Sequence, residues 1–161
     1  MTLVHNIEYK KLGISCAVSL GTGTLSGIIS AFGMGNFDSA AKPPLTPPSW
    51  LFPVVWTVLF LLMGISSYLV YTAYDKDHDL RNAALTIYAA QLVVNFFWPV
   101  IFFNLSAYLL SFIWIVLLLV MIIVMFRLFR RVNELSAYLQ IPYIIWVSFA
   151  VYLNFGVFIL N

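Results

Sequence analysis

The residues best suited to chemistry in this sequence are amides and aromatic rings that recur at helical spacing inside apolar stretches. Because side chains three and four positions apart share one face of a helix, two such faces can be drawn. Their members are Tyr88, Gln91, Asn95 and Trp98 on one face, and Tyr143, Trp146, Ala150 and Asn154 on the other. Trp56 and Phe60, four residues apart, form a third.

These faces are predicted to converge on a common interior. An amide surrounded by lipid needs a hydrogen-bonding partner, which favours an inward position for Gln91 and Asn95. A Trp or Tyr near a helix end is more often an interfacial anchor, an interpretation that fits Trp50 and Tyr74. A hollow lined by aromatic rings and a few amides suits a flat, largely apolar ligand.

The same stretches contain little that could carry acid–base, covalent or metal chemistry. Arg127, at a helix end, is the one charged residue in the predicted spans, and both histidines lie outside them. This pattern argues against an ion-coupled pump and against a haem with an axial His. No nucleophile–base pair is present in the spans, so no catalytic residue is assigned. His78 lies among aspartates in residues 75–79, but one short segment cannot complete a coordination shell, so a solvated turn is favoured and no metal site is predicted.

The elements that must position these residues are membrane-spanning helices. Hydrophobic residues make up 63% of the chain and charged residues 9%, which is more apolar surface than a soluble protein this small could bury. A span needs about 20 residues, and the longest uncharged stretch has room for two spans separated by a tight turn near 104–106. We therefore place helices at about residues 12–32, 49–74, 82–103, 106–129 and 135–160.

These spans predict an all-α integral membrane protein, a five-helix bundle that forms one domain over residues 1–161. A transmembrane β-barrel would need segments of alternating polarity, and runs such as 113–120 do not alternate. Helices also satisfy their backbone hydrogen bonds locally, as the hydrocarbon interior of a bilayer requires.

The first loop, at residues 33–48, is unusually long and rich in proline for a connection between helices. Proline fixes φ and stiffens the chain into extended turns. The prolines of this loop are Pro43, Pro44, Pro47 and Pro48. We expect a structured lid over one mouth of the bundle.

Small residues recur every four positions along the first predicted helix. They are Ser15, Ser19, Gly23, Gly27 and Ala31. Small side chains let helix backbones approach closely in lipid, so the stripe is either a dimer seam or a packing surface for a helix of the same subunit. Within the third and fifth helices, Pro99 and Pro142 predict bends that serve either packing or the shape of a cavity.

The distribution of basic residues predicts the orientation in the membrane. With five spans, one side of the membrane holds all but one of the Lys and Arg residues, and the other side holds only Lys42. Because Lys and Arg accumulate on the cytoplasmic side, we expect a multi-pass protein of the cell membrane with its N-terminus in the cytoplasm and its C-terminus outside. The net charge of +2 gives no reason to expect nucleic acid as a partner.

Three motifs in order along the chain resemble those of the TspO/MBR family, also called the translocator protein or tryptophan-rich sensory protein family. The first lies in the first loop and second helix, at residues 42–50 (KPPLTPPSW) and 52–56 (FPVVW). The second comprises residues 91–99 (QLVVNFFWP) with Phe102 and Phe103, and the third comprises 142–150 (PYIIWVSFA) with Leu153 and Asn154. The resemblance extends from the first loop to the last helix.

The resemblance implies a membrane receptor or carrier that binds a porphyrin such as protoporphyrin IX, commonly as a homodimer in the lipid bilayer, with no cofactor required. It implies a pocket roofed by the first loop. The residues expected to line or flank it are Pro47, Trp56, Phe60, Gln91, Asn95, Trp98, Tyr143, Trp146, Ala150 and Leu153. Two alternatives stay open: light- and oxygen-dependent breakdown of porphyrin through Trp56 and Trp146, or a structural or regulatory subunit of a membrane complex.

Overall fold

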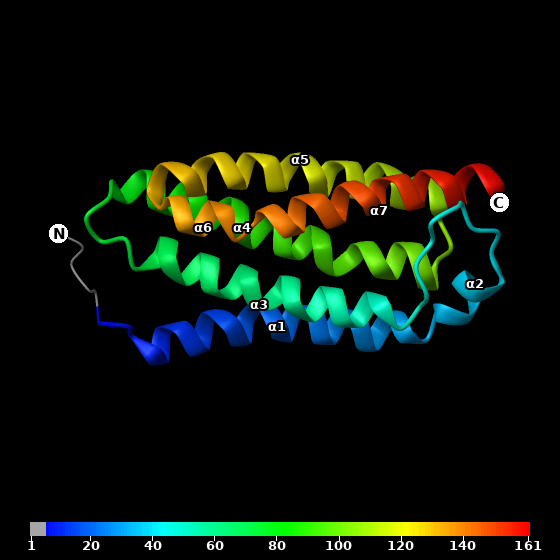
Figure 1. Ribbon diagram of the computed structural model, residues 1–161, viewed down its shortest axis with the longest axis horizontal. Coiled ribbons are helices and arrows are strands. Elements are labelled where there is room, and N and C mark those ends of the chain that lie inside the picture. The colour runs from blue at the N-terminus through cyan, green and yellow to red at the C-terminus, as the bar shows by residue number, and fades with distance from the viewer. Residues whose placement is uncertain (1–5) are drawn as a thin grey trace.

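The computed structural model describes residues 6–161, so His5 lies outside the described residues. Within this range the chain is helical, without strands, and five of its helical segments are long and apolar enough to cross a membrane. The predicted all-α, five-helix membrane fold is confirmed. The five long helices run side by side in Figure 1, and they are α1 (Tyr9–Ala31), α3 (Leu51–Tyr71), α4 (His78–Pro99), α5 (Tyr108–Val132) and α7 (Ile141–Leu160). The shorter elements are α2 (Met34–Ser39), η1 (Val100–Asn104) and α6 (Glu134–Tyr138).

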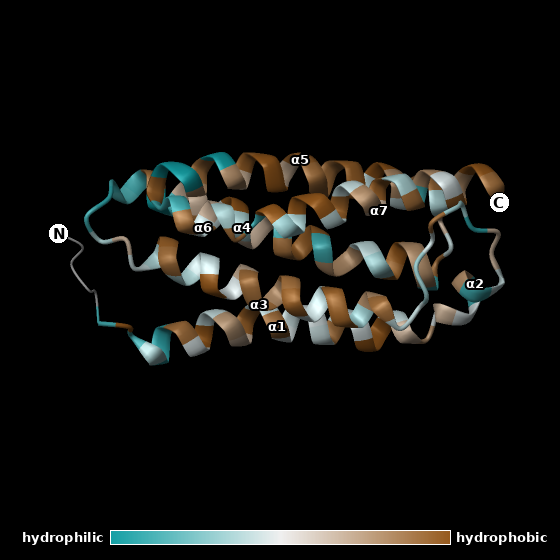
Figure 2. Cartoon of the chain, in the orientation of Figure 1, coloured by the Kyte–Doolittle hydropathy of each residue, from teal (hydrophilic) through white to brown (hydrophobic). Residues whose placement is uncertain are grey.

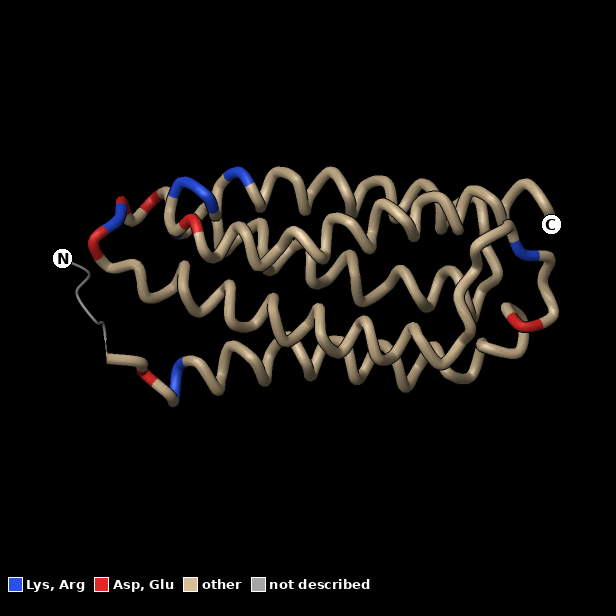
Figure 3. Tube along the Cα trace, in the orientation of Figure 1, with Lys and Arg blue, Asp and Glu red and all other residues tan. Residues whose placement is uncertain are grey.

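The bundle has the surface expected of a protein dissolved in lipid. Helix α1 packs against α3 and α4, α4 packs against α5, and α5 packs against α7. Hydrophobic residues cover most of the length of the helices (Figure 2), and acidic and basic residues gather at the two ends of the bundle (Figure 3). Large apolar side chains such as Val93, Ile113 and Ile145 point outward and are exposed. A hydrocarbon solvent makes such an exterior stable.

Helices α1 and α3 approach closely through part of the small-residue stripe. Ser19 is buried, and its Oγ donates a hydrogen bond to the carbonyl of Phe60 on α3 at 2.5 Å. A β-carbon at Gly23 would overlap the Phe60 ring, and one at Gly64 of α3 would overlap the α1 backbone at Cys16. Ser19 and Gly23 therefore serve packing within the subunit. The dimer seam stays a prediction.

The end of α4 differs from the predicted helix and turn. Pro99 is the last α-helical residue, and the next turn, η1, is a π-helix in which the N–H of Leu105 donates to the carbonyl of Val100 at 3.1 Å. Proline provides no N–H and disturbs the regular hydrogen-bond ladder, and a wider turn restores backbone pairing. The chain then reverses at Ser106, whose φ is 50°.

The last span is divided where one continuous helix from 135 to 160 was predicted. Helix α6 begins with Asn133 as its N-cap, whose side chain accepts a hydrogen bond from the N–H of Ser136 at 3.0 Å. It ends at Tyr138, and α7 starts at Ile141. Pro142 therefore lies in the first turn of α7, where its missing N–H costs nothing, instead of bending the middle of a helix.

Candidate functional site

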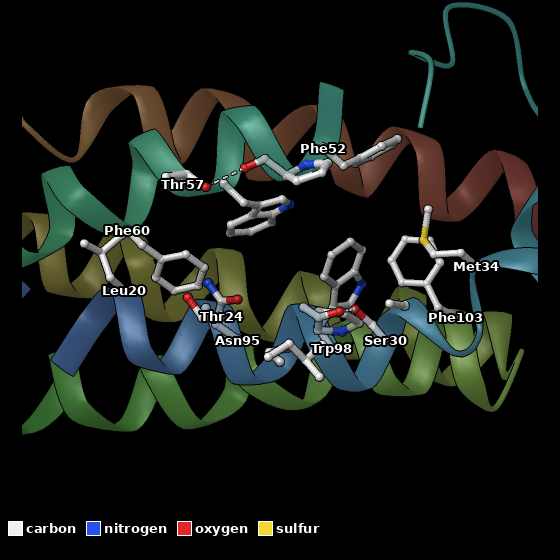
Figure 4. A pocket seen from close by; sticks show the side chains of 18 of the residues that line it. Leu20, Thr24, Ser30, Met34, Phe52, Thr57, Phe60, Asn95, Trp98 and Phe103 are labelled. Carbon is white, nitrogen blue, oxygen red and sulfur yellow. Dashed lines mark hydrogen bonds between the residues drawn. The ribbon is translucent and has the colours of Figure 1, made fainter. Parts of the chain in front are cut away.

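A cavity of about 460 Å³ lies between α1, α3 and α4 at the end of the bundle that carries α2. Aromatic side chains from three elements surround it (Figure 4). They are Phe52, Trp56 and Phe60 on α3, Trp98 on α4 and Phe103 on η1. The volume lies within the usual range for small-molecule sites, which is about 300–1,000 Å³. The arrangement provides flat apolar surfaces for a ligand to contact.

Helix α1 supplies the remaining wall with small side chains, which leave the space open. These residues are Gly23, Thr24, Ser26, Gly27 and Ser30. The row of small residues that lets α1 pack on α3 at Ser19 thus continues along the helix, where it borders the cavity. Near Ser19 the small residues allow close contact between α1 and α3. Further along α1 they leave the space between the helices unfilled.

The cavity is open on the side between α1 and α3. Six of its lining residues are also exposed on the outer surface, and they are Thr24, Gly27, Ile28 and Ala31 on α1 with Pro53 and Thr57 on α3. Because both helices belong to the apolar region of the bundle, this side faces the lipid rather than either end of the protein.

A buried hydrogen-bond network fixes the polar part of the site. The Nδ2 of Asn95, which lines the cavity, donates to the Tyr143 hydroxyl at 2.5 Å, and this hydroxyl donates to Oε1 of Gln91 at 2.8 Å. All three side chains are buried. The two amides and the phenol satisfy one another, as buried polar groups in lipid must. The network holds the Asn95 amide in one orientation at the cavity wall.

A second network positions the central indole. The Nε1 of Trp98 donates to Oδ1 of Asn154 at 3.1 Å, and Ser111 donates to the same oxygen at 2.6 Å. The Trp98 ring centroid lies 6.0 Å from that of Trp56, with 36° between the ring planes. Trp56 also contacts Tyr143 edge-on at 6.1 Å. Hydrogen bonds made on the side away from the cavity therefore hold these aromatic rings in place.

Helix α2 closes the end of the cavity. The ring of Phe37 is buried, with its centroid 6.0 Å from Phe52 and 5.5 Å from Phe103. Met34 lines the cavity directly, and the Nδ2 of Asn36 donates to the carbonyl of Phe103 at 3.1 Å. The predicted lid thus contains a short helix whose Met34 side chain forms part of the cavity wall.

The proline-rich part of the lid is attached to the end of α7. Asn161 donates from Nδ2 to the carbonyl of Ala41 at 2.9 Å and accepts from its N–H at 3.0 Å. The Tyr152 hydroxyl donates to the carbonyl of Pro44 at 2.7 Å. The lid crosses the C-terminal end of the bundle in Figure 1. These bonds hold it over α7, away from the open side between α1 and α3.

The predicted site residues divide into three groups. Trp56, Phe60, Asn95 and Trp98 line the cavity. Gln91 and Tyr143 lie directly behind it, joined to Asn95. The residues expected from the motifs that do not border the cavity are Pro47, which is half-buried in the lid, and Trp146, Ala150 and Leu153 on α7. Trp146 approaches it through Phe52, with ring centroids 6.0 Å apart.

Sequence reasoning missed the contribution of α1 and α2 to the lining. Gly23 and Gly27 were recognised as small residues, but their spacing predicts close packing and cannot show that the helices separate around a hollow. Met34 carried no spacing signal that distinguishes it from a core residue. Phe52 lies four residues before Trp56 and within the motif at 52–56, so it could have been included. Phe103 belonged to a recognised motif and could have been included.

Comparisons with known proteins agree with the motifs. The family model described as "TspO/MBR family" matches residues 15–160. "Tryptophan-rich protein TspO" of Chlorobaculum tepidum is 38% identical over 125 residues, which are 78% of each chain. "Protein CrtK" of Rhodobacter capsulatus is 37% identical over 149 residues, 92% of this chain and 89% of the relative. "Translocator protein" of Homo sapiens is 30% identical over 146 residues, 91% of this chain and 86% of the relative.

Proposed function

The chain belongs to the TspO/MBR family, and from this premise we propose that it is a membrane receptor or carrier that binds a porphyrin, such as protoporphyrin IX, in the cavity between α1, α3 and α4. The observation that supports the proposal is the aromatic lining of this cavity, to which α3 contributes Trp56 and α4 contributes Trp98. A flat conjugated ring gains most from offset or edge contacts with such rings.

The polarity of the cavity supports a ligand with an apolar body. Among the described residues, no acidic or basic side chain lines it, and Asn95 provides an amide at its wall. Burying a carboxylate there would be costly without a cation beside it. The charged substituents of a porphyrin would therefore lie toward the lid, at the end of the bundle, with the macrocycle inside.

We also propose an orientation in the membrane and an oligomeric state. The charges at the two ends of the bundle are unequal: Lys42 lies alone at the lid end, and the other basic residues of the described chain lie near the opposite end. We propose that the opposite end faces the cytoplasm and that the protein works as a homodimer in the cell membrane. A C-terminal reporter active only in the cytoplasm would contradict the orientation, and a monomer by analytical ultracentrifugation would contradict the dimer.

A fluorescence titration tests the proposed ligand. We expect metal-free protoporphyrin to quench the tryptophan emission of the purified protein saturably, because two of its five tryptophans line the cavity. Two further ligands are titrated in parallel. Haem shows whether the cavity binds a porphyrin that carries a central metal, and a sterol shows whether it binds an apolar molecule that is not flat. An absence of saturable quenching by protoporphyrin, even in large excess and with the protein folded by circular dichroism, would remove the proposal.

A further inference from the structure

A second cavity, of about 380 Å³, lies between α1, α3 and α4 near the charged end of the bundle, opposite the lid. It shares no lining residue with the first cavity. Its apolar walls are Ile14 and Val18 on α1, Tyr71 on α3 and Leu85 on α4. Ile14 and Val18 are each more than half exposed, so the cavity is a groove open to the surrounding lipid.

Two cations border the outer end of this groove. Lys11 lines it, and its Nζ lies 5.2 Å from the centroid of the Tyr74 ring. The guanidinium of Arg81 lies 5.4 Å from the same centroid, one helical turn before Leu85 of the groove wall. Both cations are therefore held against one ring at the point where the apolar groove meets the charged end of the bundle.

The two cations differ in the contacts that they already make. Lys11 forms an ion pair with Glu8 and donates to the Tyr74 hydroxyl at 2.6 Å. Arg81 donates from Nη1 to the carbonyl of Ala73 at 3.2 Å, and no ion pair of Arg81 is found in residues 6–161. A guanidinium has five N–H donors, so most of those on Arg81 can serve an added anion. A phosphate accepts such donors strongly.

We propose that this groove binds one molecule of anionic phospholipid, with an acyl chain along Ile14, Val18 and Leu85 and the phosphate at Lys11 and Arg81. The apolar groove lies at the depth of the acyl chains, and its basic outer end lies at the depth of the headgroups. The groove therefore matches both parts of a phospholipid as they are oriented in a bilayer. A soluble anion would contact only Lys11 and Arg81, and a neutral apolar molecule would contact only the apolar walls of the groove. The lipid is the occupant that uses both.

Native mass spectrometry of the full chain in detergent tests the charge preference. The probes are phosphatidylglycerol and phosphatidylcholine with identical acyl chains. We expect the first phosphatidylglycerol to bind on the order of tenfold more tightly than phosphatidylcholine. The double variant Lys11→Gln with Arg81→Gln should lose this preference. Arg130→Gln with Arg131→Gln, a matched loss of two charges at the same end on α5, should keep it.

A second pair of variants tests the groove. Ser15 lines it, so Ser15→Leu should weaken binding of the first molecule of either lipid, while Ser148→Leu, on the exposed face of α7, should not. Circular dichroism and thermal unfolding confirm that each variant is folded. Equal affinity of the wild type for both lipids would overturn the proposal, as would unchanged binding by the Lys11/Arg81 or the Ser15 variant. Binding of glycerol phosphate alone as tightly as phosphatidylglycerol would also overturn it, since the acyl chain would then contribute nothing to the affinity.

Discussion

Tyr143 connects two buried amides, those of Gln91 and Asn95. Its hydroxyl accepts from Asn95 and donates to Gln91, so one side chain satisfies two amides on another helix. The spacing of the three residues in the sequence, together with the cost of placing an amide in lipid, was enough to predict that they face inward. Which of these side chains bond to one another depends on the register between α4 and α7. This register cannot be predicted from the periodicity within either helix.

We expect Tyr143→Phe to destabilise the fold by about 1–2 kcal/mol, because it leaves buried groups of Gln91 and Asn95 without their partner. The measurement is the free energy of unfolding in detergent, compared with Tyr138→Phe, which changes an exposed tyrosine. Equal stability of both variants would mean that the network contributes nothing.

The two tryptophans of the enzymatic hypothesis occupy different positions. Trp56 lines the cavity, and Trp146 reaches it only through Phe52. We therefore predict that Trp56→Phe weakens porphyrin binding roughly two- to tenfold, whereas Trp146→Phe changes it less. Dissociation constants from porphyrin absorbance, which need no tryptophan reporter, provide the comparison. A larger loss for Trp146→Phe would place the ligand nearer α7.

At the scale of the helices, α1 has two tasks along its length. Near Ser19 it packs closely on α3, and from Gly23 onward its small residues border the cavity. Hydropathy was sufficient to locate this helix and the other spans. It could not locate η1 or the separation of α6 from α7, because both depend on how individual backbone hydrogen bonds are redirected near Pro99 and Pro142.

Gly64→Ala should separate α1 from α3, since the added methyl group would overlap the α1 backbone at Cys16. We expect a loss of about 1–3 kcal/mol in stability. The control is Gly13→Ala on α1, where a β-carbon meets no other atom within 4 Å and where alanine favours the helix. Thermal unfolding in detergent measures both. A Gly64→Ala protein as stable as Gly13→Ala would refute the close approach of the two helices.

At the scale of the whole molecule, the lid and the cavity form one unit across the chain. Residues at positions 41 and 44 bond to Tyr152 and Asn161 near the C-terminus, so closure of the lid depends on α7. The proline content of the loop predicted a stiff lid. Its attachment point was not predictable, because it rests on single hydrogen bonds between segments more than 100 residues apart.

Removal of these bonds should release the lid. We predict that Tyr152→Phe combined with Asn161→Ala speeds cleavage of the loop by proteinase K about tenfold or more, because each hydrogen bond contributes about 1 kcal/mol to closure. Ser148→Ala, which removes a hydroxyl bonded only within α7, is the control. Equal cleavage rates in the two proteins would show that these contacts do not hold the lid.

A pair of glycine variants on α1 shows whether the cavity between α1, α3 and α4 holds the ligand. Gly27 lines the cavity, Gly21 does not, and a β-carbon at either position meets no atom within 4 Å. Porphyrin binding should fall at least about tenfold in Gly27→Leu, whose side chain occupies the space, and stay at the wild-type level in Gly21→Leu. Equal affinity of the two variants, both folded, would mean that porphyrin does not occupy this cavity.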